Sequence, residues 1–144
     1  MRTVRELLKT KGRNIWSVNP TETVYDALVV MADRNVGALV VLEEGRLIGI
    51  LSERDYARKV VLQGKTSRDT LVREIMTENP VCVRPGQSIE ECMALMTGKR
   101  IRHLPVIEGD ELVGVISIGD VVKDIISEQE FVIEQLEHYI TGTR

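Results

Sequence analysis

Two serine–aspartate pairs are the residues of this sequence whose spacing best suits ligand binding. Ser52 and Asp55 lie in GILSERD, and Ser117 and Asp120 lie in GVISIGD, sixty-five residues later. Both stretches predict a strand that ends at the serine and a helix that begins there. Backbone N–H groups at a helix N-terminus attract phosphate, and a serine hydroxyl can donate a further hydrogen bond. A carboxylate three residues later can accept hydrogen bonds from the 2′- and 3′-hydroxyls of a ribose.

The same pairs have a simpler interpretation as helix caps. Serine is a favoured N-cap residue, and an aspartate in the first turn interacts favourably with the helix dipole. An isolated S-x-x-D is more often a cap than a ligand site. Its recurrence does not decide between the two, because duplication copies caps as well as ligand sites. Both interpretations stay open on these residues alone.

The elements that must position these pairs also occur twice. Residues 18–55 align without a gap on residues 83–120, and VRELL at 4–8 resembles VREIM at 72–76. In each copy, apolar residues at helical spacing follow a short strand and precede two β-rich runs joined by a tight turn. Each copy therefore predicts strand, helix, strand, strand, helix. We expect an α/β (α+β) fold of two βαββα repeats, residues 1–68 and 69–144, packed sheet to sheet and preceded by an N-terminal helix.

The last predicted helix extends further than its counterpart in the first copy. The first ends near Gly64, a plausible helix C-terminus, whereas the second runs through DVVKDIISEQEFVIEQLEHYI. One stripe continues along it: Val122, Ile125, Gln129, Val132, Leu136 and Tyr139. This stripe is wider than one small repeat requires, and it predicts a homodimer with C2 symmetry.

Composition excludes several classes of protein. The formal net charge is −3, which gives no general affinity for nucleic acid or for an anionic membrane surface. No apolar run approaches the roughly 20 residues of a membrane helix, and the N-terminus has no signal-peptide pattern. Cys82 and Cys92 are too few and too far apart for a disulfide framework or a zinc site. We expect a cytoplasmic protein with no metal.

The ordered series of motifs resembles the cystathionine β-synthase (CBS) domain. Each copy has V-x-P-x-x-[ST]-[VI] before a helix and G-[IV]-[IL]-S-x-x-D after a hairpin. The strings SERDYARKV, IRHLPV and SIGDVVK are similar to those of stand-alone bacterial proteins with two CBS domains. The resemblance extends from Val4 to about Ile126. It implies two repeats about a pseudo-twofold axis, with clefts that hold an adenine nucleotide: AMP first, with ADP, ATP or NAD as alternatives.

The resemblance also implies which residues would bind the ligand. Each cleft would combine the middle strand of one repeat with the Ser–Asp turn of the other. One would contain Ser17, Val18, Val36, Gly37, Ala38, Ser117, Gly119 and Asp120. The other would contain Cys82, Val83, Arg100, Ile101, Arg102, His103, Pro105, Ser52, Arg54 and Asp55. The adenine would lie between Val18, Val36, Val83 and Ile101. Backbone groups of Ala38 and His103 would bind its edge.

The two copies differ in charge at these positions. Arg100, Arg102 and His103 stand where the first copy has Asn35, Gly37 and Ala38. We therefore expect the cleft with Asp55 to gather more cations and to bind phosphate more strongly.

No set of residues predicts catalysis. GKTS at 64–67 lacks the glycine that a phosphate-binding P-loop needs at Lys59. Cys92 lies on the core face of a predicted helix, and the only tryptophan, Trp16, is expected to be a hydrophobic anchor. The leading hypothesis is a non-catalytic sensor that regulates an unknown protein. The alternative is a structural adaptor that works through its C-terminal helix, with vestigial clefts.

Overall fold

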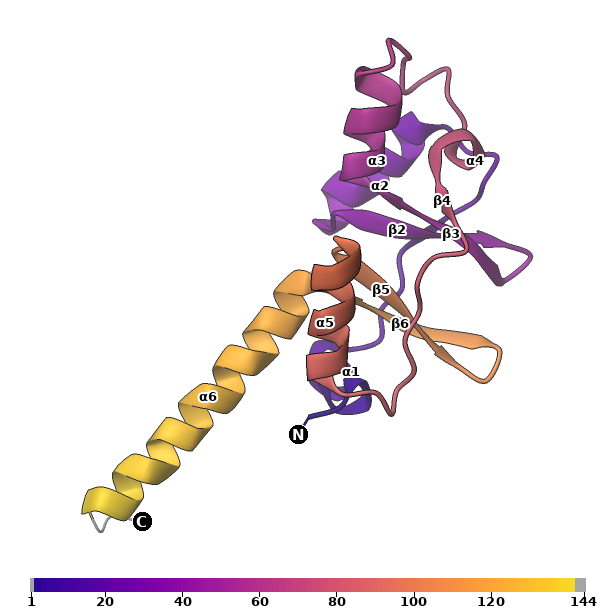
Figure 1. Cartoon of the computed structure of the whole chain (residues 1–144). Coiled ribbons are helices and arrows are strands. Elements are labelled where there is room, and N and C mark those ends of the chain that lie inside the picture. Colours follow the sequence, from indigo (N-terminus) through magenta and orange to yellow (C-terminus); the bar gives the residue numbers. More distant parts are fainter. Residues whose placement is uncertain (1, 142–144) are drawn as a thin grey trace.

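Each repeat is built around a β-hairpin of the same register. The computed structural model describes residues 2–141 (Figure 1). In the first repeat, Ala38 of β2 (Ala38–Glu43) lies opposite Ser52 of β3 (Arg46–Ser52). In the second, His103 of β5 (His103–Glu108) lies opposite Ser117 of β6 (Glu111–Ser117). The hairpin therefore places each serine beside the start of its partner strand.

Short strands and helices complete each repeat and confirm the predicted fold class. The first repeat adds β1 (Ser17–Val18), α2 (Val24–Arg34) and α3 (Glu53–Tyr56). The second adds α5 (Ile89–Lys99) and α6 (Ile118–Thr141). β1 pairs in parallel with β2, whereas its counterpart in the second repeat is a single parallel bridge between Val83 and Val106. One further strand, β4 (Thr77–Glu78), extends the first sheet to the order β1-β2-β3-β4.

The helix after Ser52 differs from its prediction. After α3 the chain widens into a π-helical turn, η1 (Ala57–Val61), in which the N–H of Leu62 donates to the carbonyl of Ala57, 3.1 Å away. Such turns occur mostly within α-helices and frequently at functional sites. Val60 is buried in the core, and Val61 and Leu62 are exposed.

The leading helices are exchanged between the repeats. α1 (Val4–Lys11) contributes Val4, Leu7 and Leu8 to the core of the second repeat. The short α4 (Val72–Ile75) contributes Val72 and Ile75 to the core of the first. Each packed core therefore takes residues from both sides of the predicted boundary between residues 68 and 69.

The exchange explains the repeated glycine of GILS and GVIS. A Cβ on Gly49 would lie 2.8 Å from the sulfur of Met76, which follows α4. A Cβ on Gly114 would lie 2.8 Å from a methyl carbon of Leu8 in α1. A Cβ on Gly49 would also lie 2.9 Å from the backbone oxygen of Thr77, so this position requires glycine, whereas at Gly114 the Leu8 side chain would have to shift.

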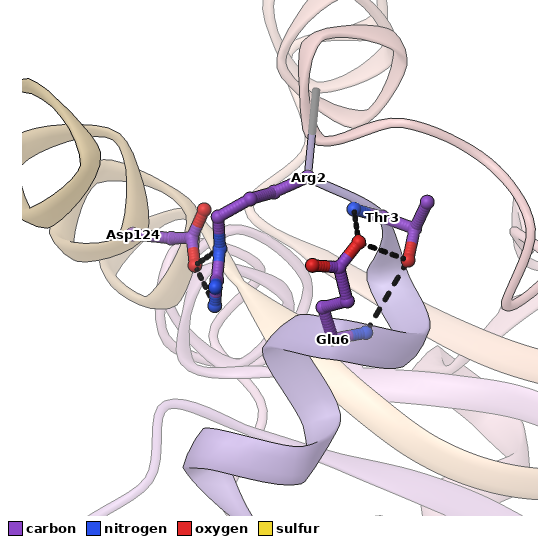
Figure 2. Close-up of polar contacts among 4 residues, drawn as sticks. All are labelled: Arg2, Thr3, Glu6 and Asp124. Carbon is purple, nitrogen blue, oxygen red and sulfur yellow. Dashed lines mark hydrogen bonds and ion pairs between the residues drawn. The ribbon is translucent and has the colours of Figure 1, made fainter. Parts of the chain in front are cut away.

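An ion pair joins α1 to α6 (Figure 2). The guanidinium of Arg2 binds Oδ1 of the buried Asp124 through Nε and Nη2, both at 2.7 Å. The other oxygen, Oδ2, is buried without a hydrogen-bond partner among the described residues. Beside this pair, Thr3 and Glu6 form the capping box that begins α1.

The C-terminal half of α6 leaves the body of the protein. Val121 is buried in the second core, and Ile118 and Ile125 pack against it. Beyond them the helix continues away from both repeats (Figure 1). No helix between residues 2 and 141 combines the length and apolarity needed to cross a membrane.

Candidate functional site

Two clefts each contain one Ser–Asp turn. The larger, which we name the Asp55 cleft, has a volume of about 590 Å³ and brings Ser52, Arg54 and Asp55 together with residues 100–103 of the other repeat. The smaller, the Asp120 cleft, has a volume of about 330 Å³ and joins Ser117 and Asp120 to residues 35–40. Each cleft thus takes its turn from one repeat and its strand start from the other.

The Ser–Asp turns have the contacts of helix caps. Oδ2 of Asp55 accepts from the N–H of Ser52 at 2.9 Å, and the Ser52 hydroxyl accepts from the N–H of Asp55 at 3.2 Å. Ser117 and Asp120 repeat both bonds, at 2.8 and 3.1 Å. The cap interpretation is therefore correct for both pairs. It does not exclude ligand binding, since each cap uses only one oxygen of its carboxylate.

The helix N-termini are less open to an anion than the sequence suggests. The N–H of Glu53 donates to the carbonyl of Gly37 at 3.0 Å, and the N–H of Ile118 donates to the carbonyl of Arg102 at 2.8 Å. Together with the serine caps, these bonds occupy two of the first three N–H groups of α3. The same holds for α6. Phosphate binding in either cleft must therefore depend mainly on side chains.

Cations concentrate in the Asp55 cleft. Arg54, Arg100 and Arg102 line it, and Nη1 of Arg54 donates to the carbonyl of Arg100 at 3.0 Å. Arg100 ends α5 with φ 55°, a left-handed conformation that Asn35 adopts with φ 54° at the end of α2. This conformation turns the chain from the helix into the cleft wall.

The second aspartate is held by a lysine of the N-terminal helix. Nζ of Lys11 donates to Oδ2 of Asp120 and to the carbonyl of Val115. Burial tends to raise the pKa of Asp120, but hydrogen bonds from Lys11 and Ser117 outweigh burial, and the net effect lowers it. Oδ1 of Asp55 has a different partner, Lys59 at 3.1 Å, on the same helical segment.

His103 and Gly37 belong to the walls of both clefts. A Cβ on Gly37 would lie 3.7 Å from Nε2 of His103 and 3.2 Å from Oε1 of Glu53, so both side chains lie close to this glycine. Burial lowers the pKa of His103, as do Lys11 and Arg102, against an opposing effect of Asp120. These effects favour the neutral form of the imidazole at this shared wall.

Several of the predicted site residues lie outside both linings. Val18 and Val83 are buried in the two cores, and Pro105 is also buried. Side chains alternate along a strand, so the same pairing that buries Val18 turns Ser17 outward. Cys82 and Gly119 likewise do not line a cleft. Of the four residues expected around an adenine, Val36 and Ile101 remain in the linings.

Other lining residues precede the first strand of each repeat. Asn14 and Trp16 line the Asp120 cleft, and Asn79 and Val81 line the Asp55 cleft. If the gapless alignment is extended four residues upstream, Asn14 pairs with Asn79. This match could have indicated from the sequence that both asparagines lie at equivalent places in the clefts. Lys11 has no such signal, because it comes from the exchanged helix. Trp16 packs against the first core, as expected of a hydrophobic anchor, and it also lines the Asp120 cleft.

The arrangement offers hydrogen-bonding and cationic groups for a bound ligand but no set for metal binding. Among residues 2–141, no three His, Cys, Asp or Glu side chains gather where they could hold a metal ion. Burial raises the pKa of Cys82 and raises that of Cys92 to about 11, so neither thiol is activated.

Comparison with known proteins gives consistent matches. The model of the CBS domain matches residues 4–62 and 72–127. The mitochondrial CBS domain-containing protein CBSX3 of Arabidopsis thaliana is 41% identical over 150 residues, which cover 97% of this chain and 72% of that protein. The structure of a protein with CBS domains from Burkholderia ambifaria MC40-6 has a TM-score of 0.86 and 51% identity, covering 89% of this chain and 96% of that one.

A more distant structure shares the fold. The CBS domain pair of protein MJ0100, in complex with 5′-methylthioadenosine and S-adenosyl-L-methionine, has a TM-score of 0.79 at 20% identity. The match covers 89% of this chain and 98% of that one.

Proposed function

The chain belongs to the CBS domain family, and on this premise we propose that it is a non-catalytic regulatory module that binds an adenine nucleotide in its two clefts. The observation that carries the proposal is that each Ser–Asp turn meets the strand start of the opposite repeat inside a cleft. Ribose hydroxyls would donate to Asp55 or Asp120. Val36 and Ile101 would contact the adenine.

The Asp55 cleft is the better nucleotide site. Its three arginines supply charge-assisted hydrogen bonds to phosphate, and its volume exceeds that of the Asp120 cleft. We propose AMP as the first ligand, with ADP, ATP and NAD as alternatives. The bound adenosine derivatives of MJ0100 support the adenosine moiety in general.

A regulatory module acts on a partner, and we extend the proposal to its assembly, its location and its target. The chain forms a homodimer, works in the cytoplasm and signals nucleotide binding to a regulated protein. The exposed apolar stripe of α6 supports self-association. The same stripe supports the second candidate, a structural adaptor in which α6 acts without any ligand.

Calorimetric titration with AMP, ADP, ATP, NAD and S-adenosylmethionine tests the proposal. Trp16 is the only tryptophan and lines the Asp120 cleft, so its fluorescence reports occupancy of that cleft. We expect the first additions of AMP to release heat while Trp16 emission changes little, because the Asp55 cleft fills first. Trp16 emission should change at higher AMP concentration, when the Asp120 cleft fills. A protein that binds none of the five would be the adaptor instead. Formation of a product from ATP would indicate an enzyme.

A further inference from the structure

The projecting part of α6 exposes large apolar side chains to solvent. We name residues 127–141 the α6 arm. Its large apolar side chains are between 49% and 86% exposed: Phe131, Val132, Ile133, Leu136, Tyr139 and Ile140. Five of them, all except Phe131, lie on one side of the helix at 3.6 residues per turn. A continuous exposed apolar surface of this kind marks an interaction site.

The charges of the arm are all acidic. Four glutamates lie in it, Glu128, Glu130, Glu134 and Glu137, and residues 127–141 contain no lysine or arginine. A second arm would therefore repel this one electrostatically. A surface that is apolar and basic would complement it.

The first repeat carries such a surface, which we name the basic face. It consists of the exposed apolar residues Tyr25 and Val29 on α2 and Val61 and Leu62 at the end of η1. Residues 57–68 contain four cations, Arg58, Lys59, Lys65 and Arg68, and no acidic residue.

Two contacts join the parts of this face. The N–H of Tyr25 donates to the carbonyl of Ser67 at 3.0 Å. The guanidinium of Arg68 lies over the Tyr25 ring at 3.8 Å from its centre. The apolar residues of α2 and the basic segment after η1 therefore belong to one surface.

The arm of a chain cannot reach its own basic face. The arm runs away from the first repeat, and α2 and α3 lie at the other end of the molecule (Figure 1). A second copy of the chain can supply a basic face for the arm and an arm for the basic face. A twofold axis would make the contact reciprocal, so that two arms cover two faces.

We propose that the α6 arm of one copy docks on the basic face of a second copy. The proposal rests on the homodimer of the proposed function and assigns its interface. At 1.5 Å per residue the arm is about 22 Å long, enough for four helical turns of contact. The docked arm would lie beside the Asp55 cleft, because Lys59 of the basic face binds Oδ1 of Asp55.

Charge reversal tests this pairing. An arm variant carries Glu134→Lys and Glu137→Lys, and a face variant carries Arg58→Glu and Lys65→Glu. All four side chains are exposed, so both variants should fold. Circular dichroism and melting temperature verify this. In sedimentation velocity at micromolar concentration, we expect each variant alone to have a dimer Kd raised at least tenfold.

The two variants mixed in equal amounts should dimerise again. In the mixed dimer, the lysine-bearing arm meets the glutamate-bearing face, and the native arm meets the native face. Both contacts are then complementary. A matched control with Glu43→Lys and Glu111→Lys, exposed hairpin residues away from both surfaces, should dimerise as the wild type does.

Each other outcome overturns a specific statement. A monomeric wild type would refute the homodimer and with it the interface. A wild-type dimer that neither variant weakens would refute the interface alone and leave the arm to a different, basic partner. Variants that stay monomeric after mixing would show that the arm and the face do not meet each other.

Discussion

Asp55 and Asp120 have two roles that the structure makes compatible. In both, Oδ2 completes a capping box, and the side chain still lines a cleft. The aspartates therefore contribute to stability whether or not a ribose is bound. A test of nucleotide binding must separate the loss of a cap from the loss of a ligand contact.

The aspartates are tested by the ligand-induced rise in melting temperature. AMP at a hundred times its Kd should stabilise the wild type by about 2.7 kcal/mol per site, a rise of roughly 5–10 °C. The variant with Asp55→Ala and Asp120→Ala should lose nearly all of this rise relative to its own unliganded state. Thr23→Ala removes the N-cap of α2 outside both clefts, at a cost of about 0.5–2 kcal/mol. This control should keep the full rise. An undiminished rise in the aspartate variant would leave the pairs as caps alone.

The arginines of the Asp55 cleft should distinguish AMP from adenosine. Arg100→Asn preserves the left-handed position, since Asn35 occupies the equivalent place, and Arg102→Gln removes the second charge. A charge-assisted hydrogen bond contributes about 1.5–3 kcal/mol, so AMP affinity should fall ten- to a hundredfold. Adenosine affinity should change far less in calorimetry. Arg46→Gln, at the exposed first position of β3, is the control. Equal losses for the two ligands would contradict phosphate binding here.

The contact between Lys11 and Asp120 should make the free energy of unfolding depend on pH. The pKa of Asp120 is lower in the folded protein than in the unfolded chain. The ionised carboxylate therefore stabilises the folded state at pH values above its unfolded pKa, and this stabilisation is lost as the pH falls through its folded pKa. Lys11→Met should reduce the free energy of unfolding at pH 7, and the difference from the wild type should shrink toward pH 3. Urea unfolding at several pH values measures this. A difference that stays constant with pH would show that Lys11 acts through packing.

At the scale of elements, the sequence predicted most of what positions the clefts. Hairpins, helices and both Ser–Asp turns follow from apolar periodicity and capping residues, because these are local signals. The exchange of α1 and α4 was not predicted, because VRELL and VREIM have the same apolar pattern and either helix could pack on either core. Lys11 was missed for the same reason. Val18 and Val83, which were expected beside an adenine, are buried in the two cores. A two-residue strand and a single bridge give too little alternation for the sequence to assign their faces.

The contact between α1 and α6 should depend on both members of its ion pair. Arg2→Met leaves the buried Asp124 carboxylate with neither oxygen paired, which should cost about 1–3 kcal/mol. Adding Asp124→Leu removes the stranded charge and should recover most of the loss. Urea unfolding of the two variants and the wild type gives the comparison. A double variant less stable than Arg2→Met would contradict this account.

At the scale of the whole molecule, the exchange ties the repeats together. A protease site placed in the exposed segment 62–66 would divide the chain between them. After cleavage, the first fragment keeps α1 in the second core, and the second fragment keeps α4 in the first core. The fragments should elute together in native gel filtration and separate in urea. Separation under native conditions would mean that the exchanged helices hold too weakly to join the repeats.

The exchanged helix also sets an order of assembly during translation. α1 precedes its core in the chain, because the residues that bury Val4, Leu7 and Leu8 extend from Val83 to Val121. The chain must therefore be synthesised as far as Val83 before α1 can contact any of its core. The first repeat can close sooner, because α4 follows it directly in the chain. Until the second repeat emerges, α1 is an isolated helix of eight residues, too short to persist in water. On the nascent chain, α1 is thus among the last helices of the two repeats to become buried.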